Sequence, residues 1–222
     1  MGEATIPFPM VIAGPIIRLG LLLALLVHPG VAAEPTQRVS RHVDIRIGCI
    51  PGDQSHPAGT ELLFVNSKPF IPIGVSYHFT QCRDSWDEDL QAMHNLGLNT
   101  VRIDLSWRDV APIIPGHYHF SLLDNFLDLA SKHGLYVIPV FSHTTQEFNT
   151  PLWFWAIYRD WRVVDQDGHV PLDDLPSVNH PVYRKLLRDY IEATVRHIKD
   201  HPAVLACQLL NEPRYDPKRL YD

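Results

Sequence analysis

The fold is decided by the stretch LLDNFLDLASKHGLYVIPVF, residues 122–141. Its first part places apolar residues at positions 122, 123, 126, 127, 129 and 130, on one face of a helix over 122–133. Gly134 is a typical helix stop. The run 135–141 that comes next is almost continuously apolar, as in strands covered on both faces. The stretch therefore predicts a helix that leads directly into a strand of a parallel sheet.

The same alternation extends in both directions along the chain. Before the stretch, the pattern predicts a strand over 71–76, a helix over 86–96 and a strand over 100–105. After it, the pattern predicts a short aromatic helix near 151–158, a long helix over 181–199 and a strand over 204–210. This β-α-β-α-β-α-β order indicates an α/β fold, either doubly wound or closed as a (β/α)8 TIM barrel. The chain supplies about half of the β/α units that a barrel needs.

The N-terminal part of the chain is predicted to lie outside this sheet. Arg18 precedes the apolar run 19–27, and small residues occur at 31–33, so residues 1–33 are expected to be a secretory signal peptide. The protein is then secreted, periplasmic or extracellular, and an uncleaved membrane anchor is the alternative. Residues 34–60 are predicted to form a leader or loop with one short strand. Apolar runs at 61–65 and 70–73 flank Asn66-Ser67-Lys68-Pro69, which predicts a β-hairpin.

Composition excludes several classes of function. The net charge of −6 and the pI near 6.1 give no basic surface, so no nucleic-acid partner is expected. No Gly-rich phosphate-binding motif comes after any predicted strand, which removes the main support for a nucleotide cofactor. The 13 histidines and three cysteines show no metal-ligand spacing, so no metal and no cofactor are predicted. A Cys49–Cys82 disulfide and three free thiols both remain open.

Polar and aromatic side chains gather at the carboxyl ends of the predicted strands. Both candidate folds place their functional residues there. The candidates for contacts with a substrate or for catalysis are Tyr77, Arg102, Trp107, His143, Asn211 and Glu212.

Glu212 is the strongest of these candidates. It comes after the apolar strand 204–210, where partial loss of hydration raises a carboxyl pKa into the range suited to proton donation. Pro213 stiffens the turn, and Asn211 offers both donors and acceptors for a hydroxyl group. A turn that merely ends a strand is the alternative.

The remaining candidates have structural alternatives of their own. Arg102 interrupts an apolar strand and must therefore face a carboxylate or a polar pocket, and a local pair with Asp104 is the simpler explanation. His143 ends the third strand and can hydrogen-bond a hydroxyl. The loops are rich in aromatic rings, including Trp107, on which sugar faces stack. For Trp153 and Trp155, packing beneath a loop is the favoured explanation.

Several motifs resemble a known group of enzymes. Asn211-Glu212-Pro213 after the fourth predicted strand resembles the acid/base signature of clan-A retaining glycoside hydrolases, which are (β/α)8 barrels. The motifs GHYHFS (116–121), NHPVYR (179–184) and HPAV (201–204) resemble family 42 β-galactosidases. NSKPF (66–70) and NTVR (99–102) look equally like the cellulases and mannanases of family 5. The resemblance runs from about residue 64 to 214.

The resemblance implies a function. Hydrolysis of a β-glycoside or polysaccharide would proceed by retaining double displacement, with Glu212 as proton donor, Asn211 on the hydroxyl next to the reacting carbon, and Arg102 near the nucleophile. In this clan the nucleophile is a glutamate after strand seven. Residues 61–222 would accordingly be a partial TIM-barrel domain, the N-terminal half, and we expect this chain to be inactive alone.

The same resemblance suggests partners. They are a carbohydrate substrate and either a C-terminal half of the barrel or a second copy of the chain. The alternative function is a non-catalytic carbohydrate-binding or assembly partner built on a degenerate half-barrel.

Overall fold

The structure is a computed structural model that describes residues 43–50, 52, 59–141, 150–158, 164–165, 167–169, 180–211 and 219–220. The chain divides into two compact units, residues 1–38 and 39–222, and every described residue belongs to the second. The predicted signal peptide at 1–33 therefore lies outside the described residues, as does much of the predicted leader at 34–60.

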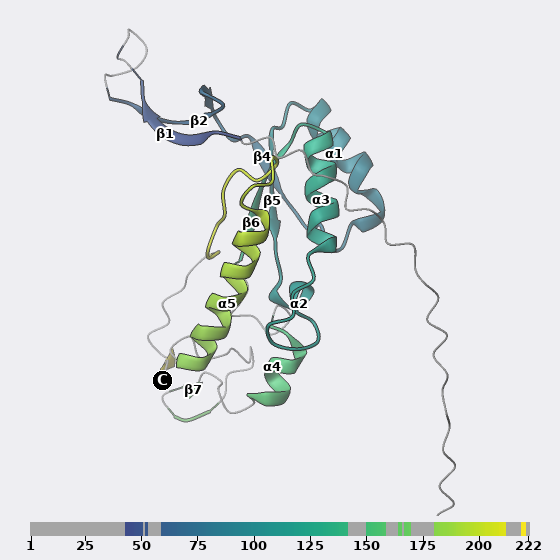
Figure 1. Ribbon diagram of the computed structural model, residues 1–222, viewed down its shortest axis with the longest axis vertical. Helices are drawn as coiled ribbons and strands as arrows, with labels where there is room; N and C mark the ends of the chain where they lie inside the picture. Colours follow the sequence, from purple (N-terminus) through teal and green to yellow (C-terminus); the bar gives the residue numbers. More distant parts are fainter. Residues whose placement is uncertain are drawn as a thin grey trace, which may run out of the picture. The chain divides into compact units, whose positions relative to one another are not determined.

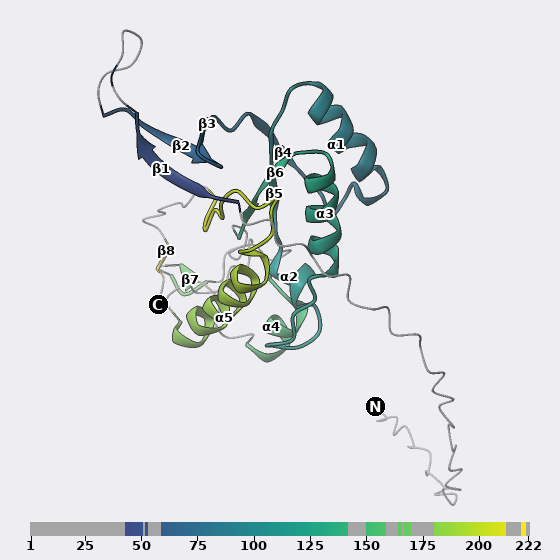
Figure 2. The same cartoon turned by 45° about the horizontal axis from the view of Figure 1, so that its top comes forward.

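The described part begins with a small antiparallel sheet. Its strands are β1 (Ile45–Cys49), β2 (Glu61–Val65) and β3 (Lys68–Phe70), in the order β1-β2-β3 (Figure 2). The turn between β2 and β3 is tighter than the sequence suggests, because Asn66 and Ser67 alone form it, with φ values of 50° and 64°. The Asn66 side-chain oxygen accepts a hydrogen bond from the Asp44 amide at 3.2 Å, which ties the turn to the start of β1.

The second sheet is parallel and lies at the centre of the fold. It consists of β4 (Gly74–Tyr77), β5 (Thr100–Asp104) and β6 (Tyr136–Val140), in the order β4-β5-β6 (Figure 1). Ser76 pairs with Arg102, and Tyr77 pairs with Ile103. Gly74 is needed at the start of β4, because a Cβ atom there would collide with the carbonyl oxygen of Thr100.

The fourth predicted strand, 204–210, is corrected by the structure. It joins the sheet only through two parallel bridges, between Val137 and Val204 and between Val140 and Gln208. The partners advance by three residues along β6 and by four along the other segment, so the segment bulges between the bridges. Pro139 lies in this interval and has no N–H to donate, which explains why a continuous ladder does not form.

Helices pack against the parallel sheet. The three long ones are α1 (Trp86–Asn95), α3 (Ser121–Lys132) and α5 (Pro181–Ile198), close to the predicted ranges. Helices α1 and α3 lie side by side in both views (Figures 1 and 2), and Lys132 and His133 both contact the Asp87 carboxylate at 2.8 Å. Shorter elements are η1 (Arg83–Ser85), α2 (Trp107–Val110), α4 (Leu152–Ile157), β7 (Val164–Asp165) and β8 (Arg219–Leu220).

The hydrophobic core lies between the parallel sheet and these helices. Val101 and Ile103 of β5 are fully buried against it, together with Leu90 of α1 and Phe126 and Leu127 of α3. Within the described ranges, no helix combines the length and the apolar character needed to cross a membrane. All three cysteine thiols are free.

Candidate active site

The two faces of the parallel sheet differ in chemistry. Successive side chains of a strand point to opposite faces, so Ser76, Arg102 and Asp104 share one face, which we call the open face. Tyr77, Val101 and Ile103 share the other, which we call the helix-covered face because it meets the hydrophobic core. Two predicted site residues of the strands, Arg102 and Tyr77, therefore lie on different faces.

Arg102 is the centre of a polar cluster on the open face. Each nitrogen of its guanidinium group donates a hydrogen bond to a different side chain. Nε donates to Gln208 Oε1 at 3.1 Å, Nη1 to Ser76 Oγ at 2.7 Å and Nη2 to Asn211 Oδ1 at 2.8 Å. The cluster therefore joins β4, β5 and the segment 201–211 at the carboxyl edge of the sheet.

Asp104 adds the anionic partner that the sequence suggested. Its Oδ1 lies 3.4 Å from Arg102 Nη1, and the side chains are 26% (Arg102) and 24% (Asp104) exposed. Partly exposed pairs of this kind contribute only about 1 kcal/mol or less to folding. Arg102 thus makes the local pair with Asp104 and also the long-range hydrogen bonds to Gln208 and Asn211.

Asn211 is the last described residue before the predicted proton donor. Its side-chain oxygen is engaged by Arg102, so the chain is held beside the guanidinium one residue before Glu212. Glu212 and His143 both lie outside the described residues. Of the six predicted site residues, the structure brings together Arg102 and Asn211.

The predicted substrate contact through Tyr77 is corrected. Its side chain is on the helix-covered face, where its hydroxyl donates to Asp89 Oδ2 at 2.5 Å and its ring stacks on Phe126 at 6.0 Å. Burial, followed by the hydrogen bond to Asp89, raises the pKa of Tyr77, while the hydrogen bond from Tyr77 lowers the pKa of Asp89. Tyr77 therefore anchors the end of β4 to α1 and points away from Arg102.

The predicted sugar contact through Trp107 is corrected as well. Trp107 is 2% exposed and lies inside an aromatic cluster. Its ring stacks on Tyr190 at 5.7 Å and meets Trp153 edge-on at 5.5 Å. Its indole N–H has no acceptor in the described part of the chain. A ring enclosed in this way packs α2 against α4 and α5, and no face of it is open to a sugar.

Two members of the cluster were not among the predicted residues. Ser76 is the register partner of Arg102, one position before Tyr77, and the alternation of side chains along β4 was the signal that identifies it. Gln208 is the one polar residue within the apolar run 204–210, which marks it as a residue with a specific partner.

Comparison with known proteins gives a consistent result. The family model of glycoside hydrolase family 42, described as beta-galactosidase, matches residues 76–221. Beta-galactosidase BgaA of Clostridium cellulovorans is 27% identical over 145 residues, which are 63% of this chain and 21% of that protein. An exo-beta-D-glucosaminidase of Pyrococcus horikoshii is 26% identical over 160 residues. This match covers 64% of this chain and 21% of the glucosaminidase.

A solved structure shows the same relationship. The β-galactosidase from the psychrophilic Marinomonas ef1 superimposes with a TM-score of 0.56 and 28% identity, over 64% of this chain and 22% of that one. The chain thus spans about a fifth of the length of the proteins it matches. The predicted resemblance to family 42 is confirmed, and these matches favour it over family 5.

Proposed function

The chain belongs to glycoside hydrolase family 42, and from this premise we propose that it carries the acid/base half of a retaining β-galactosidase site. Glu212 is the proposed proton donor to the leaving-group oxygen. Asn211 would bind the hydroxyl next to the reacting carbon, and Arg102 would lie beside the nucleophile. The observation that supports this most directly is the 2.8 Å hydrogen bond from Arg102 to Asn211, the residue before Glu212.

The proposed chemistry needs a second carboxyl group. In retaining enzymes it stands about 5–5.5 Å from the acid/base and attacks the anomeric carbon. Asp104 is a poor candidate for this nucleophile, because it lies on the same strand as Arg102 and pairs with it. We propose that a segment completing the barrel supplies the nucleophile, and that the Arg102 guanidinium helps to orient it.

The fold supports this architecture. The parallel order β4-β5-β6 and the bridges to Val204 and Gln208 are the arrangement expected of the first four strands of a (β/α)8 barrel. In β4, the edge strand of this sheet, and in the segment that leads into it, the side chains of Val75, Ile71 and Ile73 are exposed. Exposed apolar side chains at a sheet edge favour association, so the proposed partner is the remainder of the barrel.

The acid/base role is tested by Glu212→Gln in the protein with its barrel completed. Loss of the acid should abolish cleavage of galactosides with poor leaving groups, such as methyl β-D-galactopyranoside, and spare dinitrophenyl β-D-galactoside far more. Glu192→Gln is the matched control, since Glu192 is an exposed residue of α5 that pairs with Arg196. Unchanged cleavage of the methyl galactoside by Glu212→Gln would remove Glu212 from the mechanism.

The substrate is tested in the same assay. Aryl β-galactoside and aryl β-glucosaminide are compared, because relatives carry both activities in their names. We expect the galactoside to be preferred. Binding of galactosides with no hydrolysis in the completed protein would instead favour a non-catalytic carbohydrate-binding role.

Export is a further part of the proposal. The basic residue, apolar run and small residues of 1–33 support a cleaved secretory signal. N-terminal sequencing of the protein recovered from outside the cytoplasm should begin at Glu34. A protein retained in the membrane with residues 1–33 intact would favour the anchor instead.

A further inference from the structure

Gln208 occupies an unusual position in the polar cluster. Its main chain is fixed to the sheet, because its N–H donates to the Pro139 carbonyl at 2.9 Å and its carbonyl accepts from the Phe141 N–H at 2.9 Å. It is therefore the last point at which the segment 201–211 is hydrogen-bonded through its main chain to β6 in the described residues. Residues 209–211 lie beyond this main-chain pairing, so their position depends on other contacts.

The side chain of Gln208 uses both ends of its amide. Oε1 accepts from Arg102 Nε at 3.1 Å, and Nε2 donates to the carbonyl of Leu210 at 2.8 Å. A carboxylate can make the first bond but not the second, and an aliphatic side chain can make neither. The two contacts together therefore require a side-chain amide, which offers both an acceptor and a donor.

The turn after Gln208 is not held by hydrophobic burial. The side chains of Leu209 and Leu210 are 60% and 51% exposed. Asn211, in contrast, is held through its side-chain oxygen by Arg102 Nη2 at 2.8 Å. Gln208 is therefore connected to Asn211 in two ways. One connection runs through the Arg102 guanidinium, and the other through the carbonyl of Leu210, the residue before Asn211.

We propose that Gln208 is a positioning residue that sets the orientation of the Asn211 side chain through Arg102 and the Leu210 carbonyl. With Oδ1 of Asn211 engaged by Arg102, the NH2 group of the amide is the end left to bind a hydroxyl oxygen. Gln208 then determines how well the site distinguishes a sugar that carries this hydroxyl from one that lacks it. This last step rests on the proposed function, whereas the orientation of Asn211 does not.

The test uses the 222-residue chain with Gln208→Leu and Gln208→Glu. Gln91→Leu is the matched control, because Gln91 is exposed on α1 and bonds only Asn95 among the described residues. Two quantities are measured by NMR: the side-chain amide signals of Asn211, and the affinities for methyl β-D-galactopyranoside and its 2-deoxy analogue. The ratio of the two affinities is insensitive to a general loss of folded protein.

We expect Gln208→Leu to shift the Asn211 amide signals and to weaken binding of the 2-hydroxy sugar about tenfold, with the 2-deoxy sugar unaffected. Gln208→Glu keeps the bond to Arg102 and should give an intermediate effect, and it decides the matter if Gln208→Leu does not fold. Unchanged Asn211 signals in the folded variants would overturn the proposal. If the wild-type chain binds neither sugar, recognition of the sugar requires the completed barrel, and the Asn211 signals alone then decide the role of Gln208.

Discussion

The two faces of the parallel sheet make opposite use of neighbouring residues. On the helix-covered face, Val101 and Ile103 are fully buried and Tyr77 is bonded to a helix. On the open face, Arg102 keeps a quarter of its surface exposed and gathers partners from three chain segments. One face is held by packing and the other by directed hydrogen bonds, although both belong to the same strands.

The difference indicates where stability and function reside. Burial of apolar area is the larger contribution to folding, whereas partly exposed polar contacts contribute little individually. Substitutions on the helix-covered face should therefore act on unfolding, and substitutions on the open face on ligand binding. This division would be contradicted by a helix-covered substitution that mainly weakens ligand binding, or by an open-face substitution that mainly destabilises the fold.

The largest effect is expected for Trp107→Ala, in the aromatic cluster that continues the helix-covered side. Removing a buried indole should lower the free energy of unfolding by about 3–5 kcal/mol, measured by urea denaturation. Trp107→Phe is the control. It keeps a packed ring and removes an N–H that has no acceptor in the described residues, so it should lose far less. A mild effect of the alanine variant would mean that the cluster around Tyr190 is loosely packed.

Arg102→Met should have a smaller effect on stability and a larger one on the site. The methionine keeps the apolar stem but leaves Ser76, Gln208 and Asn211 without their shared donor, at a cost of about 1–2 kcal/mol in unfolding free energy. Galactoside binding, measured by NMR titration, should be lost while the chain stays folded. Binding that survives this substitution would place the sugar elsewhere.

The sequence predicted the elements of this fold better than their contacts. Periodicity and the stop at Gly134 located α3 and the strand after it to within a residue or two. The charge of Arg102 in an apolar strand correctly indicated a polar environment. The irregular fourth strand was missed, because the effect of Pro139 on a neighbouring segment depends on pairing that a single strand does not reveal.

The error at Tyr77 arose from a shift of one residue, and the error at Trp107 from burial. Tyr77 was selected because it ends a strand, but the register places Ser76 beside Arg102 and turns Tyr77 to the helices. A step of one residue in a strand reverses the face, and end-of-strand position alone does not fix the face. Trp107 was selected for its aromatic ring, and the structure buries that ring instead.

Tyr77→Phe tests the helix-covered face at a single hydrogen bond. Loss of the bond to Asp89 should lower the unfolding free energy by about 1 kcal/mol near neutral pH. Because the folded pKa of Asp89 is lowered, the stability it contributes is present above its unfolded pKa and is lost as the pH falls through the folded value. The pKa of Tyr77 is raised, so its contribution is full below its ordinary value of 10.0 and declines at higher pH.

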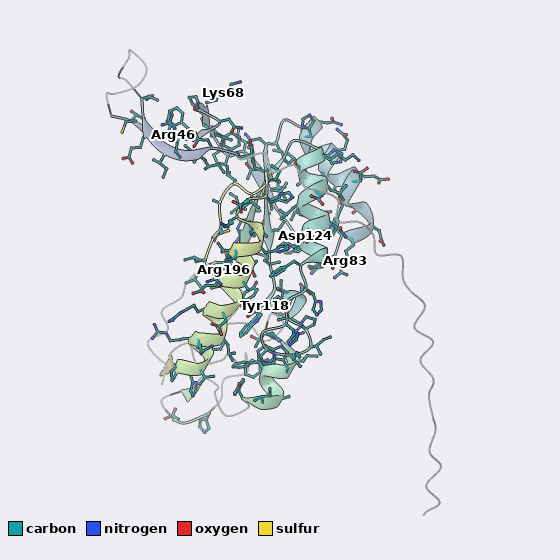
Figure 3. All side chains as sticks on the ribbon, in the orientation of Figure 1. Arg46, Lys68, Arg83, Tyr118, Asp124 and Arg196 are labelled. Carbon is teal, nitrogen blue, oxygen red and sulfur yellow. The ribbon has the colours of Figure 1, made fainter. Side chains whose placement is uncertain are left out.

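The difference in stability between wild type and Tyr77→Phe should therefore narrow in acid and in strong alkali. Denaturation curves across pH measure it. Tyr118→Phe is the control (Figure 3), since the pKa of Tyr118 is raised by burial first and then by Asp189, with no hydrogen bond to Asp89. A difference that stays constant as the pH falls would show that the Tyr77–Asp89 bond does not depend on the carboxylate charge.

Ser76→Ala should have the smallest effect on stability and sharpens the comparison furthest, because Ser76 and Tyr77 are neighbours on opposite faces. Its hydroxyl bonds only Arg102 in the described part of the chain, and Ser76 is exposed, so the unfolding free energy should change by about 0.5 kcal/mol or less. The guanidinium loses one of its contacts but keeps Gln208 and Asn211. Galactoside affinity should consequently fall two- to threefold, roughly what a weak neutral acceptor contributes. A loss of stability equal to that of Tyr77→Phe would show that the single hydrogen bond of Ser76 on the open face supports the fold as strongly as the Tyr77–Asp89 bond on the helix-covered face.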